Sequence, residues 1–397
     1  EHYKAAVFIV VKEMLKVKKS FLLLLGALIS LNGRAEISSP IENSQAVVQT
    51  HPKESGLMLD IARHFYPPEV IKSFIDTLSE AGGTFLHLHF SDDENYALES
   101  ELLNQRVDGA IQKNGIYINP HTQKPFLSYQ QIKDIKDYAK LKGIEIIPEL
   151  DSPAHMRGIF RLLQNAKGKD YAQSVASPQV SDEINMTNPQ SIAFIQDLLD
   201  EVINVFANSS RHIHIGGDEF GYDINNNEEF IGYANTLTEF LRQKGLKARM
   251  WNDGLIKKNL DKLDSSIEIT YWSFDGDKQD TQEVKRLRSA RAALPDLLAK
   301  GFKVLNYNSY YLYLTPESAT AFPKDAEFAK NDLLKNWDLG VWDGENKQNK
   351  VANSENLIGA ALSIWGENAK ALKSENIQKD SKPLLKAVIQ KTNLASQ

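Results

Sequence analysis

The segment SIAFIQDLLDEVINVFANSSRHIHIGGDEF, residues 191–220, contains one complete helix-strand unit of the chain. Apolar residues three and four positions apart predict a helix over 191–206, and the alternating run at 212–215 predicts a buried strand. Two glycines and two neighbouring carboxylates, Asp218 and Glu219, directly follow this strand. A helix that leads into a buried strand is the building unit of folds with a parallel sheet.

The same alternation continues on both sides of this segment. It predicts eight buried strands, at 56–61, 84–90, 143–150, 212–215, 247–251, 267–272, 303–308 and 358–365. Helical patterns lie between them at 68–81, 129–141, 191–206 and 228–244, and the crossover after Trp251 has the weakest helical pattern. The sequence therefore predicts an α/β protein in which residues 56–397 form a single (β/α)8 TIM barrel. The alternative is a doubly wound open sheet, which would need a glycine-rich phosphate turn where Asp60-Ile61-Ala62-Arg63 stands.

Composition narrows the class of protein further. The 397 residues are 42% hydrophobic and 25% charged, which is typical of a globular protein and excludes a disordered or fibrous one. The net charge of −6 argues against a nucleic-acid binder, which normally needs a basic surface. The absence of cysteine excludes disulfides, thiolate nucleophiles and cysteine-ligated metal sites.

The N-terminal region is predicted to lie outside the barrel. Residues 14–35 have a basic start, an apolar run at 21–31 and small residues after it, which is the layout of a secretory signal peptide. Residues 1–13 are a possible non-native upstream segment, and 36–55 are predicted to be a flexible lead-in. We expect a secreted, extracellular protein with no stable membrane anchor, although a short anchor left in place is the alternative. Removal of residues 1–35 leaves 40 basic and 50 acidic residues, a net charge of −10.

Acidic and aromatic residues follow nearly every predicted strand. They include Asp60, Arg63, Asp92, Glu149, Asp151, His155, Asp218, Glu219, Trp251, Trp272, Asp277, Tyr313, Trp365 and Glu367. The strand ends of a TIM barrel that carry the active site lie on one face, so these side chains are expected to converge. Carboxylates among indole rings suit a carbohydrate, because sugar C–H faces pack on aromatic rings while hydroxyls donate to carboxylates. The alternative for any one acid is a solvated loop residue.

The adjacent pair Asp218-Glu219 favours an unusual form of glycoside hydrolysis. A conventional retaining glycosidase places two carboxyl groups about 5 Å apart across the scissile bond. Neighbouring residues on an extended chain point to opposite sides, so this pair cannot simply flank a bond. The two carboxyls can instead divide the work, with Glu219 as the acid and Asp218 holding a 2-acetamido group whose oxygen attacks the anomeric carbon.

Seven motifs together resemble glycoside hydrolase family 20, the β-N-acetylhexosaminidases. They are HIHIGGDEF (212–220), LDIARHFY (59–66), HLHFSDDE (87–94), ELDSPAHM (149–156), MWNDG (250–254), TYWS (270–273) and LSIWGE (362–367). The resemblance runs from about residue 56 to the C-terminus. Ala154 departs mildly from the family pattern, which usually has glycine before the histidine.

The resemblance implies a role for each candidate residue. Glu219 matches the general acid/base and Asp218 the carboxylate that orients the acetamido group. Tyr313 matches the tyrosine that binds the acetamido carbonyl, and the sugar pocket would be walled by Trp251, Trp272 and Trp365. Arg63 and Glu367 match the pair that holds the far hydroxyls of the sugar, and Asp92 and His155 a network that tunes the acid. Tyr222 and Asp277 complete the expected substrate-binding residues.

The resemblance also implies a substrate. Many family members have an extra α+β domain before the barrel, and those expected to lack it include secreted enzymes that cleave poly-β-1,6-N-acetylglucosamine of biofilm matrices. Only about twenty residues separate the predicted signal peptide from the first predicted strand here, so the extra domain is not expected. The resemblance therefore implies a retaining β-N-acetylglucosaminidase that acts on this polysaccharide. We expect a monomer that needs no cofactor or metal. The alternatives are action on β-1,4 chito-oligosaccharides or other glycans, a two-carboxylate retaining glycosidase using Glu219 and Glu367, and a non-catalytic sugar-binding barrel.

Two further patterns have open interpretations. The pairs His87/His89 and His212/His214 each point to one face of a strand and could bind a metal, but we expect buried structural histidines because no third ligand is evident nearby. The acidic stretch at 275–280 is either a solvated loop or a contact for cationic, partly deacetylated glucosamine units of the polymer.

Overall fold

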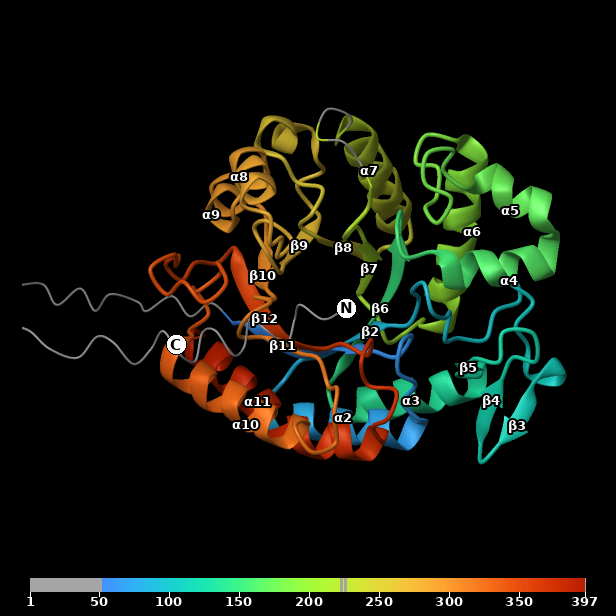
Figure 1. The fold of residues 1–397 in the computed structure, drawn as a ribbon, viewed down its shortest axis with the longest axis horizontal. Helices are drawn as coiled ribbons and strands as arrows, with labels where there is room; N and C mark the ends of the chain where they lie inside the picture. Colours follow the sequence, from blue (N-terminus) through green and yellow to red (C-terminus); the bar gives the residue numbers. More distant parts are fainter. Residues whose placement is uncertain (1–51, 222–223, 225–226, 397) are drawn as a thin grey trace, which may run out of the picture. The chain divides into compact units, whose positions relative to one another are not determined.

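Eight parallel strands close into a barrel in the computed structural model, which describes residues 52–221, 224 and 227–396 (Figure 1). The barrel strands, in chain order, are β1 (Glu54–Asp60), β2 (Phe85–His89), β6 (Glu145–Ser152), β7 (His212–Gly216), β8 (Lys247–Trp251), β9 (Glu268–Tyr271), β10 (Val304–Asn306) and β12 (Leu357–Ile364). Strand β1 pairs in parallel with β12, from Glu54 opposite Gly359 to Leu59 opposite Ile364. This pairing closes the ring, confirms the (β/α)8 prediction and excludes an open sheet.

The connections between the strands are mostly helical. They contain α2 (Pro68–Ala81), α3 (Tyr129–Leu141), α4 (Arg157–Lys167), α5 (Lys169–Val175), α6 (Pro189–Val205), α7 (Asn227–Gln243), α8 (Thr281–Ala290), α9 (Leu294–Ala299) and α10 (Phe322–Asn336), and α11 (Ser374–Leu394) follows the last strand. The weak crossover after Trp251 holds only the 3-10 helix η3 (Lys257–Lys262). Helix α11 packs between α10 and α2 along the lower edge of Figure 1. The last helix of the chain therefore contacts the first helix of the barrel.

The first strand begins two residues inside the predicted lead-in, which corrects that boundary. Lys53 Nζ donates to the carbonyls of Ser354 and Leu357 at 2.7 Å, and the Glu54 carboxylate lies 2.5 Å from Arg249 Nη2. These contacts tie the start of β1 to β8 and to the segment before β12, so residues 54 and 55 belong to the barrel. The predicted upstream segment 1–13, the signal peptide 14–35 and most of the lead-in lie outside the described residues.

Residues of β2 alternate between two cores, as the pattern His-Leu-His predicts. Leu86 and Leu88 face the helices and are buried in the large core between strands and helices. Phe85 packs inside the barrel with Trp251 and Tyr307, and the His87 ring also lies against these two rings. Because successive side chains on a strand point to opposite faces, every second residue points into the barrel. The C-terminal ends of all eight strands lie on one face of the barrel, so the inward side chains at these ends lie near one another.

Two parts of the fold lie outside the eight-unit pattern. Between β2 and α3 the chain forms the short 3-10 helix η1 (Val107–Gly109) and an antiparallel sheet of β3 (Ile111–Lys113), β4 (Ile116–Ile118) and β5 (Pro125–Phe126), seen beside the barrel in Figure 1. Strand β11 (Tyr313–Leu314) pairs with the end of β12. Over the described part of the chain, we find no helix that is both long and apolar enough to cross a membrane.

Candidate active site

Asp218 and Glu219 lie just beyond the end of β7, in a turn that depends on glycine. Gly216 and Gly217 have φ values of +82° and +95°, a region that side chains rarely adopt. Glu219 itself has a φ of +47°, and such a conformation in a residue with a side chain costs free energy and is enriched at functional sites. The turn places the Asp218 side chain in the interior, 12% exposed, and leaves that of Glu219 56% exposed.

His155 joins these two carboxylates from the neighbouring strand. It follows β6, and its Nε2 lies 3.6 Å from Asp218 Oδ2 and 3.5 Å from Glu219 Oε2. Its other ring nitrogen, Nδ1, lies 3.2 Å from Asp92 Oδ1, and Asp92 follows β2. Three strands therefore bring together the four residues that the sequence placed in the acid and its supporting network.

The environment of each group sets its acidity. Burial would lower the pKa of His155, but the neighbouring Asp218 and Asp92 raise it well above its usual value. The contact with His155 Nε2 at 3.5 Å is the main reason that the pKa of Glu219 is lowered. Burial raises the pKa of Asp218 to about 7, although His155 acts in the opposite direction. In the free protein the two adjacent carboxyls thus differ in acidity, with Glu219 favouring its ionised form and Asp218 its protonated form.

A third carboxyl, Asp151, lies close to Asp218; the sequence analysis placed it among the strand-end candidates but gave it no role. Asp151 is fully buried on β6, and neither of its carboxylate oxygens has a hydrogen-bond partner within the described part of the chain. Its ligand atom lies within 4.8 Å of those of His155 and Asp218. Burial and the nearby Asp218 raise the pKa of Asp151 well above the usual value, which favours its neutral form. The available signal was its spacing of two residues from Glu149, which puts both side chains inside the barrel.

Arg63 lies at the end of β1 among carboxylates. Its guanidinium nitrogens are 3.2 Å from Asp60 Oδ2, 2.9 Å from Asp92 Oδ2 and 3.2 Å from Glu94 Oε2. Burial opposes its charge, but Asp60, Asp92, Glu94 and Glu367 raise the pKa of Arg63 above its usual value. Arg63 is therefore a fixed cation within electrostatic reach of Glu367, its predicted partner, and it also pairs with Asp92.

The predicted aromatic residues form one cluster. The rings of Trp272 and Tyr313 are stacked with centroids 6.1 Å apart, and the Trp365 ring lies 5.7 Å from Tyr313 and 6.1 Å from Trp251. Arg63 lies over the ring of Trp365 at 5.5 Å. The partly exposed rings of Tyr313 and Trp365 offer flat apolar surface beside the carboxylates, which is what a sugar ring needs. Trp251, predicted as a pocket wall, is only 1% exposed and packs in the barrel core against Trp365.

Two of the indoles are held by buried carboxylates that the sequence analysis did not assign to the site. Trp272 Nε1 donates to Asp253 Oδ2 at 2.6 Å, and Trp251 Nε1 donates to Glu149 Oε1 at 2.7 Å. Asp253 also accepts from the backbone N–H of Glu219 at 3.4 Å. These carboxylates fix the aromatic rings relative to the acid.

The acidic stretch at 275–280 is not a free anionic loop. Asp275 Oδ2 pairs with Arg288 Nε at 2.6 Å, and Asp280 accepts from the backbone N–H groups of Gln282 and Glu283 as the N-cap of α8. Asp277 and Lys278 approach the site. Asp277 accepts from the Ser273 hydroxyl and, together with burial, raises the pKa of Tyr313, while Lys278 helps to lower the pKa of Glu219. Of the predicted substrate-binding residues, Tyr222 lies outside the described part of the chain.

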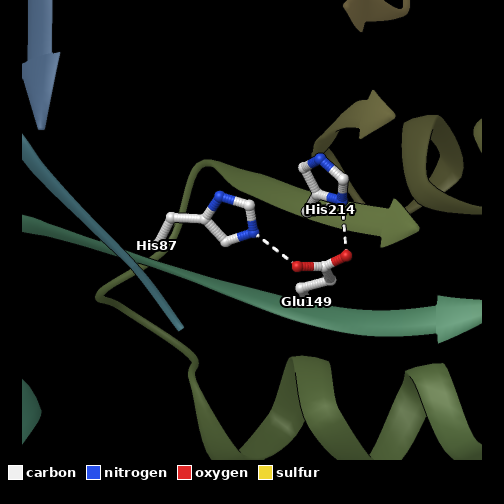
Figure 2. A group of neighbouring side chains, drawn as sticks. All are labelled: His87, Glu149 and His214. Carbon is white, nitrogen blue, oxygen red and sulfur yellow. Dashed lines mark hydrogen bonds and ion pairs between the residues drawn. The ribbon is translucent and has the colours of Figure 1, made fainter. Parts of the chain in front are cut away.

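The histidine pairs lie inside the barrel. A further residue that could bind a metal, Glu149, lies beside His87 and His214, which the sequence analysis did not predict. Figure 2 shows the Glu149 carboxylate between His87 and His214, with ligand atoms within 4.8 Å of one another. Both rings already have hydrogen-bond partners: His87 contacts Glu149 and Tyr307, whereas His214 contacts Thr270 and the N–H of Gly216. His212, nearer the start of β7, contacts Glu145. These bonds account for the histidines as structural groups.

Comparison with known proteins gives a family match over most of the chain. The model of the glycosyl hydrolase family 20 catalytic domain matches residues 55–379. The solved structure of dispersin B is 64% identical, with a TM-score of 0.85, and the match covers 86% of this chain and 99% of that one.

Curated relatives are more distant and longer. A lacto-N-biosidase of Bifidobacterium bifidum is 26% identical over 64% of this chain and 22% of its own length. The β-hexosaminidase subunit A2 of Dictyostelium discoideum is 25% identical over 79% of this chain and 53% of its own. The chain thus spans between about a fifth and a half of the length of these relatives.

Proposed function

The chain belongs to glycosyl hydrolase family 20, and on that basis we propose that it is a retaining β-N-acetylglucosaminidase whose nucleophile is the substrate's own 2-acetamido group. The observation that carries the proposal is the position of His155 between Asp218 and Glu219, at 3.6 and 3.5 Å. One imidazole thus contacts both the carboxyl assigned to proton donation and the carboxyl assigned to balancing positive charge.

Glu219 acts first, as the general acid. Its carboxyl protonates the glycosidic oxygen while the acetamido carbonyl oxygen forms a bond to the anomeric carbon and the leaving sugar departs. In the free protein the pKa of Glu219 is lowered by His155, but more than half of its side chain is exposed. A bound sugar would cover this surface and remove water, which favours the protonated form that the step requires.

Asp218 acts on the acetamido group. In its ionised form it accepts from the acetamido N–H and balances the charge of the cyclic oxazolinium intermediate, so substrate binding has to release the proton that burial favours in the free protein. Water then attacks the anomeric carbon, Glu219 takes up the proton of that water, and the acetamido group is released with the configuration retained.

The surrounding residues bind the terminal sugar. Trp272 and Trp365 provide its apolar walls, with the buried Trp251 packed against Trp365, and Tyr313 donates to the acetamido carbonyl. Arg63 and Glu367 hold the far hydroxyls, and Tyr222 and Asp277 contribute to substrate binding. Asp92 and His155 tune the acid.

The substrate is the poly-β-1,6-N-acetylglucosamine of a biofilm matrix, cleaved by a secreted monomer. This finer assignment is supported by the similarity to dispersin B along nearly the whole of that chain, together with the substrate that the sequence resemblance implied. Action on β-1,4 chito-oligosaccharides is the second candidate, because the distant relatives include β-hexosaminidases.

Defined oligomers test the linkage. Initial rates on β-1,6 and β-1,4 N-acetylglucosamine oligomers of equal length should favour the β-1,6 series. Faster cleavage of the β-1,4 series would transfer the assignment to chito-oligosaccharides, and no cleavage of either series would reject the proposed activity.

A second experiment separates the mechanisms. Substrates with a 2-hydroxyl in place of the acetamido group should be nearly inert, and a thiazoline mimic of the cyclic intermediate should inhibit. A covalent 2-fluoro-sugar adduct found on Glu367 by mass spectrometry would instead favour the two-carboxylate alternative.

A further inference from the structure

The Glu149 carboxylate is the meeting point of two chains of side-chain contacts inside the barrel. Glu149 lies on β6 and is fully buried. Its Oε2 accepts from His87 Nε2 at 2.8 Å and from His89 Nδ1 at 2.7 Å, while its Oε1 accepts from Trp251 Nε1 at 2.7 Å. Figure 2 shows this carboxylate against the ring of His87.

One chain leads from Glu149 to the candidate acid. The second ring nitrogen of His89, Nε2, lies 2.6 Å from Asp92 Oδ2. The other oxygen of Asp92 faces His155 at 3.2 Å, and His155 faces Glu219 at 3.5 Å. Every contact from Glu149 to Glu219 thus alternates a carboxylate with an imidazole.

The other chain leads to the aromatic cluster. The Trp251 ring that donates to Glu149 lies 6.1 Å from Trp365, and Trp365 lies edge-on to His89 at 5.2 Å. The same carboxylate therefore positions Trp251, a buried ring that packs against Trp365 of the proposed sugar site, and the first histidine of the acid-tuning chain.

Only an ionised carboxylate can serve all of these donors. His89 places a ring nitrogen against a carboxylate on each side, Glu149 and Asp92, and both favour its charged form. The Glu149 surroundings contain His87 and His89 from β2, Asp151 from β6, His214 from β7 and, farther toward the base of the barrel, Arg249 from β8. A glutamine at this position would keep one acceptor oxygen and bring an amide that donates, so it could not accept from Trp251 and from both histidines.

We propose that Glu149 is a positioning residue that couples the sugar-binding wall to the protonation of Glu219, through Trp251 on one side and His89–Asp92–His155 on the other. This inference rests on the proposed function for its effect on turnover. It goes beyond the predicted network of Asp92 and His155, because it adds Glu149 to that network. Glu149 lies in the barrel interior and also holds Trp251.

The substitution that tests the inference is Glu149→Gln, and the barrel supplies a matched control. Glu145 lies on the same strand, is also buried, and also bonds a histidine, with its Oε1 at 2.9 Å from His212 Nδ1. It lies at the opposite end of β6, where its partners are His212 and Arg211 rather than residues of the site. Glu145→Gln thus reproduces the loss of a buried histidine-bound carboxylate without touching the two chains.

Steady-state kinetics on an aryl N-acetylglucosaminide is the first readout. We expect Glu149→Gln to lower kcat by roughly 10- to 100-fold, the usual scale for loss of an outer positioning partner, and to raise KM severalfold as Trp251 shifts. Glu145→Gln should lower the melting temperature but keep kcat and KM within about twofold of the wild type. Equal kinetic losses in both folded variants would overturn the inference, because the effect would then be general destabilisation.

Nuclear magnetic resonance of histidine-labelled protein is the second readout and does not depend on activity. In the wild type both ring nitrogens of His89 should carry protons through neutral pH, whereas in Glu149→Gln the pKa of His89 should fall because one of its two carboxylates is gone. If Glu149→Gln does not fold, Trp251→Phe supplies the test: it removes the donor to Oε1 and should shift the His89 signals through the shared carboxylate.

The two proposals fail in different ways. A wild-type protein that cleaves no N-acetylglucosaminide would reject the proposed function, while the His89 signals would still decide whether Glu149 couples the two chains. His89 signals that are unchanged in Glu149→Gln or in Trp251→Phe would overturn the coupling even in a fully active enzyme.

Discussion

Gly216 lies directly against Asp151, at a place where a Cβ on the glycine would come 2.0 Å from Oδ1 of the aspartic acid. The same Cβ would lie 2.7 Å from the backbone nitrogen of Ser152. Because backbone as well as side chain blocks the position, β7 can approach β6 this closely only with glycine at its end. The contact lets Asp218, two residues further on, reach the buried Asp151.

Gly216→Ala should therefore destabilise the barrel and abolish activity. A left-handed conformation costs a side-chain residue about 1–2 kcal/mol, and the clash with β6 adds to that cost. Gly245→Ala is the control, because Gly245 has a similar φ of +77° but a Cβ there would meet no atom of the described residues within 4 Å. Denaturant unfolding should show the larger loss for Gly216→Ala, and equal losses would mean that the contact with Asp151 is unimportant.

Glu219→Gln should slow cleavage according to the leaving group. Glutamine keeps the shape of the side chain but cannot donate the proton, so turnover of oligosaccharides should fall at least ~10²-fold, the usual scale for general acid catalysis. An aryl substrate with a good leaving group needs less protonation and should lose less in the bond-breaking step. Single-turnover rates on both substrates measure the difference, and an equal loss on both would argue against Glu219 as the acid.

Asp218→Asn should stabilise the fold more at pH 8 than at pH 4, although it removes activity. Burial raises the pKa of Asp218 to about 7, above its ordinary value of 3.8, so the folded protein holds a proton that the unfolded chain releases between these values. The wild type therefore loses stability as the pH rises from about 4 to 7, by up to about 4 kcal/mol for one isolated group, and asparagine removes this loss.

Thermal unfolding at pH 4, 6 and 8 measures the effect. The melting temperature of Asp218→Asn relative to the wild type should increase across the series. Asp170→Asn, at an exposed position on α5, serves as the control and should show no such trend. A constant difference for Asp218→Asn would show that the buried carboxyl does not hold its proton at neutral pH.

Chelator treatment should leave activity unchanged. The proposed chemistry is carried by Glu219, Asp218 and the substrate, and the barrel histidines nearest Glu149 have hydrogen-bond partners on the ring atoms that a metal would need. Activity that is lost with a chelator and restored by a divalent ion would reopen a metal site at His87, Glu149 and His214.

The barrel and the candidate catalytic pair could be predicted because both depend on local patterns. Helices α2 and α3 have the predicted bounds, since their apolar spacing and flanking residues set the helix ends. The pair Asp218-Glu219 was found because a strand, two glycines and two acids follow one another along the chain. Convergence of the strand ends then follows from barrel symmetry alone.

What escaped prediction depends on contacts between distant parts of the chain. Strands β3, β4 and β5 have two or three residues each, too few to show a period. The roles of Glu149 and Asp253 as acceptors for two indoles require knowing which strands are neighbours. The sequence shows the stretch at 275–280 only as a run of acidic residues. The ion pair of Asp275 with Arg288 and the capping of α8 by Asp280 depend on the folded backbone, so the sequence did not reveal them.

The variants Asp277→Asn and Asp280→Asn should differ sharply in their cleavage rates. Asp277 bonds with Ser273 and, together with burial, raises the pKa of Tyr313, so Asp277→Asn should lower cleavage of both a neutral aryl N-acetylglucosaminide and the β-1,6 polymer. We expect a loss of roughly 10-fold, the scale of one hydrogen bond to a charged group. Asp280 caps α8, and asparagine is an equally good N-cap, so Asp280→Asn should keep the fold and both activities.

Salt dependence decides whether the stretch also captures cationic polymer. Attraction between exposed charges is screened beyond about 8 Å at physiological salt, so capture by Asp280 would emerge only as a low-salt loss on partly deacetylated polymer. Rates on that polymer and on the neutral aryl substrate, at low and physiological salt, should show no such selective loss in Asp280→Asn. A selective low-salt loss in Asp280→Asn would restore the interpretation that Asp280 contacts cationic polymer. A loss on the polymer alone in Asp277→Asn would show that Asp277 does not contact the terminal sugar.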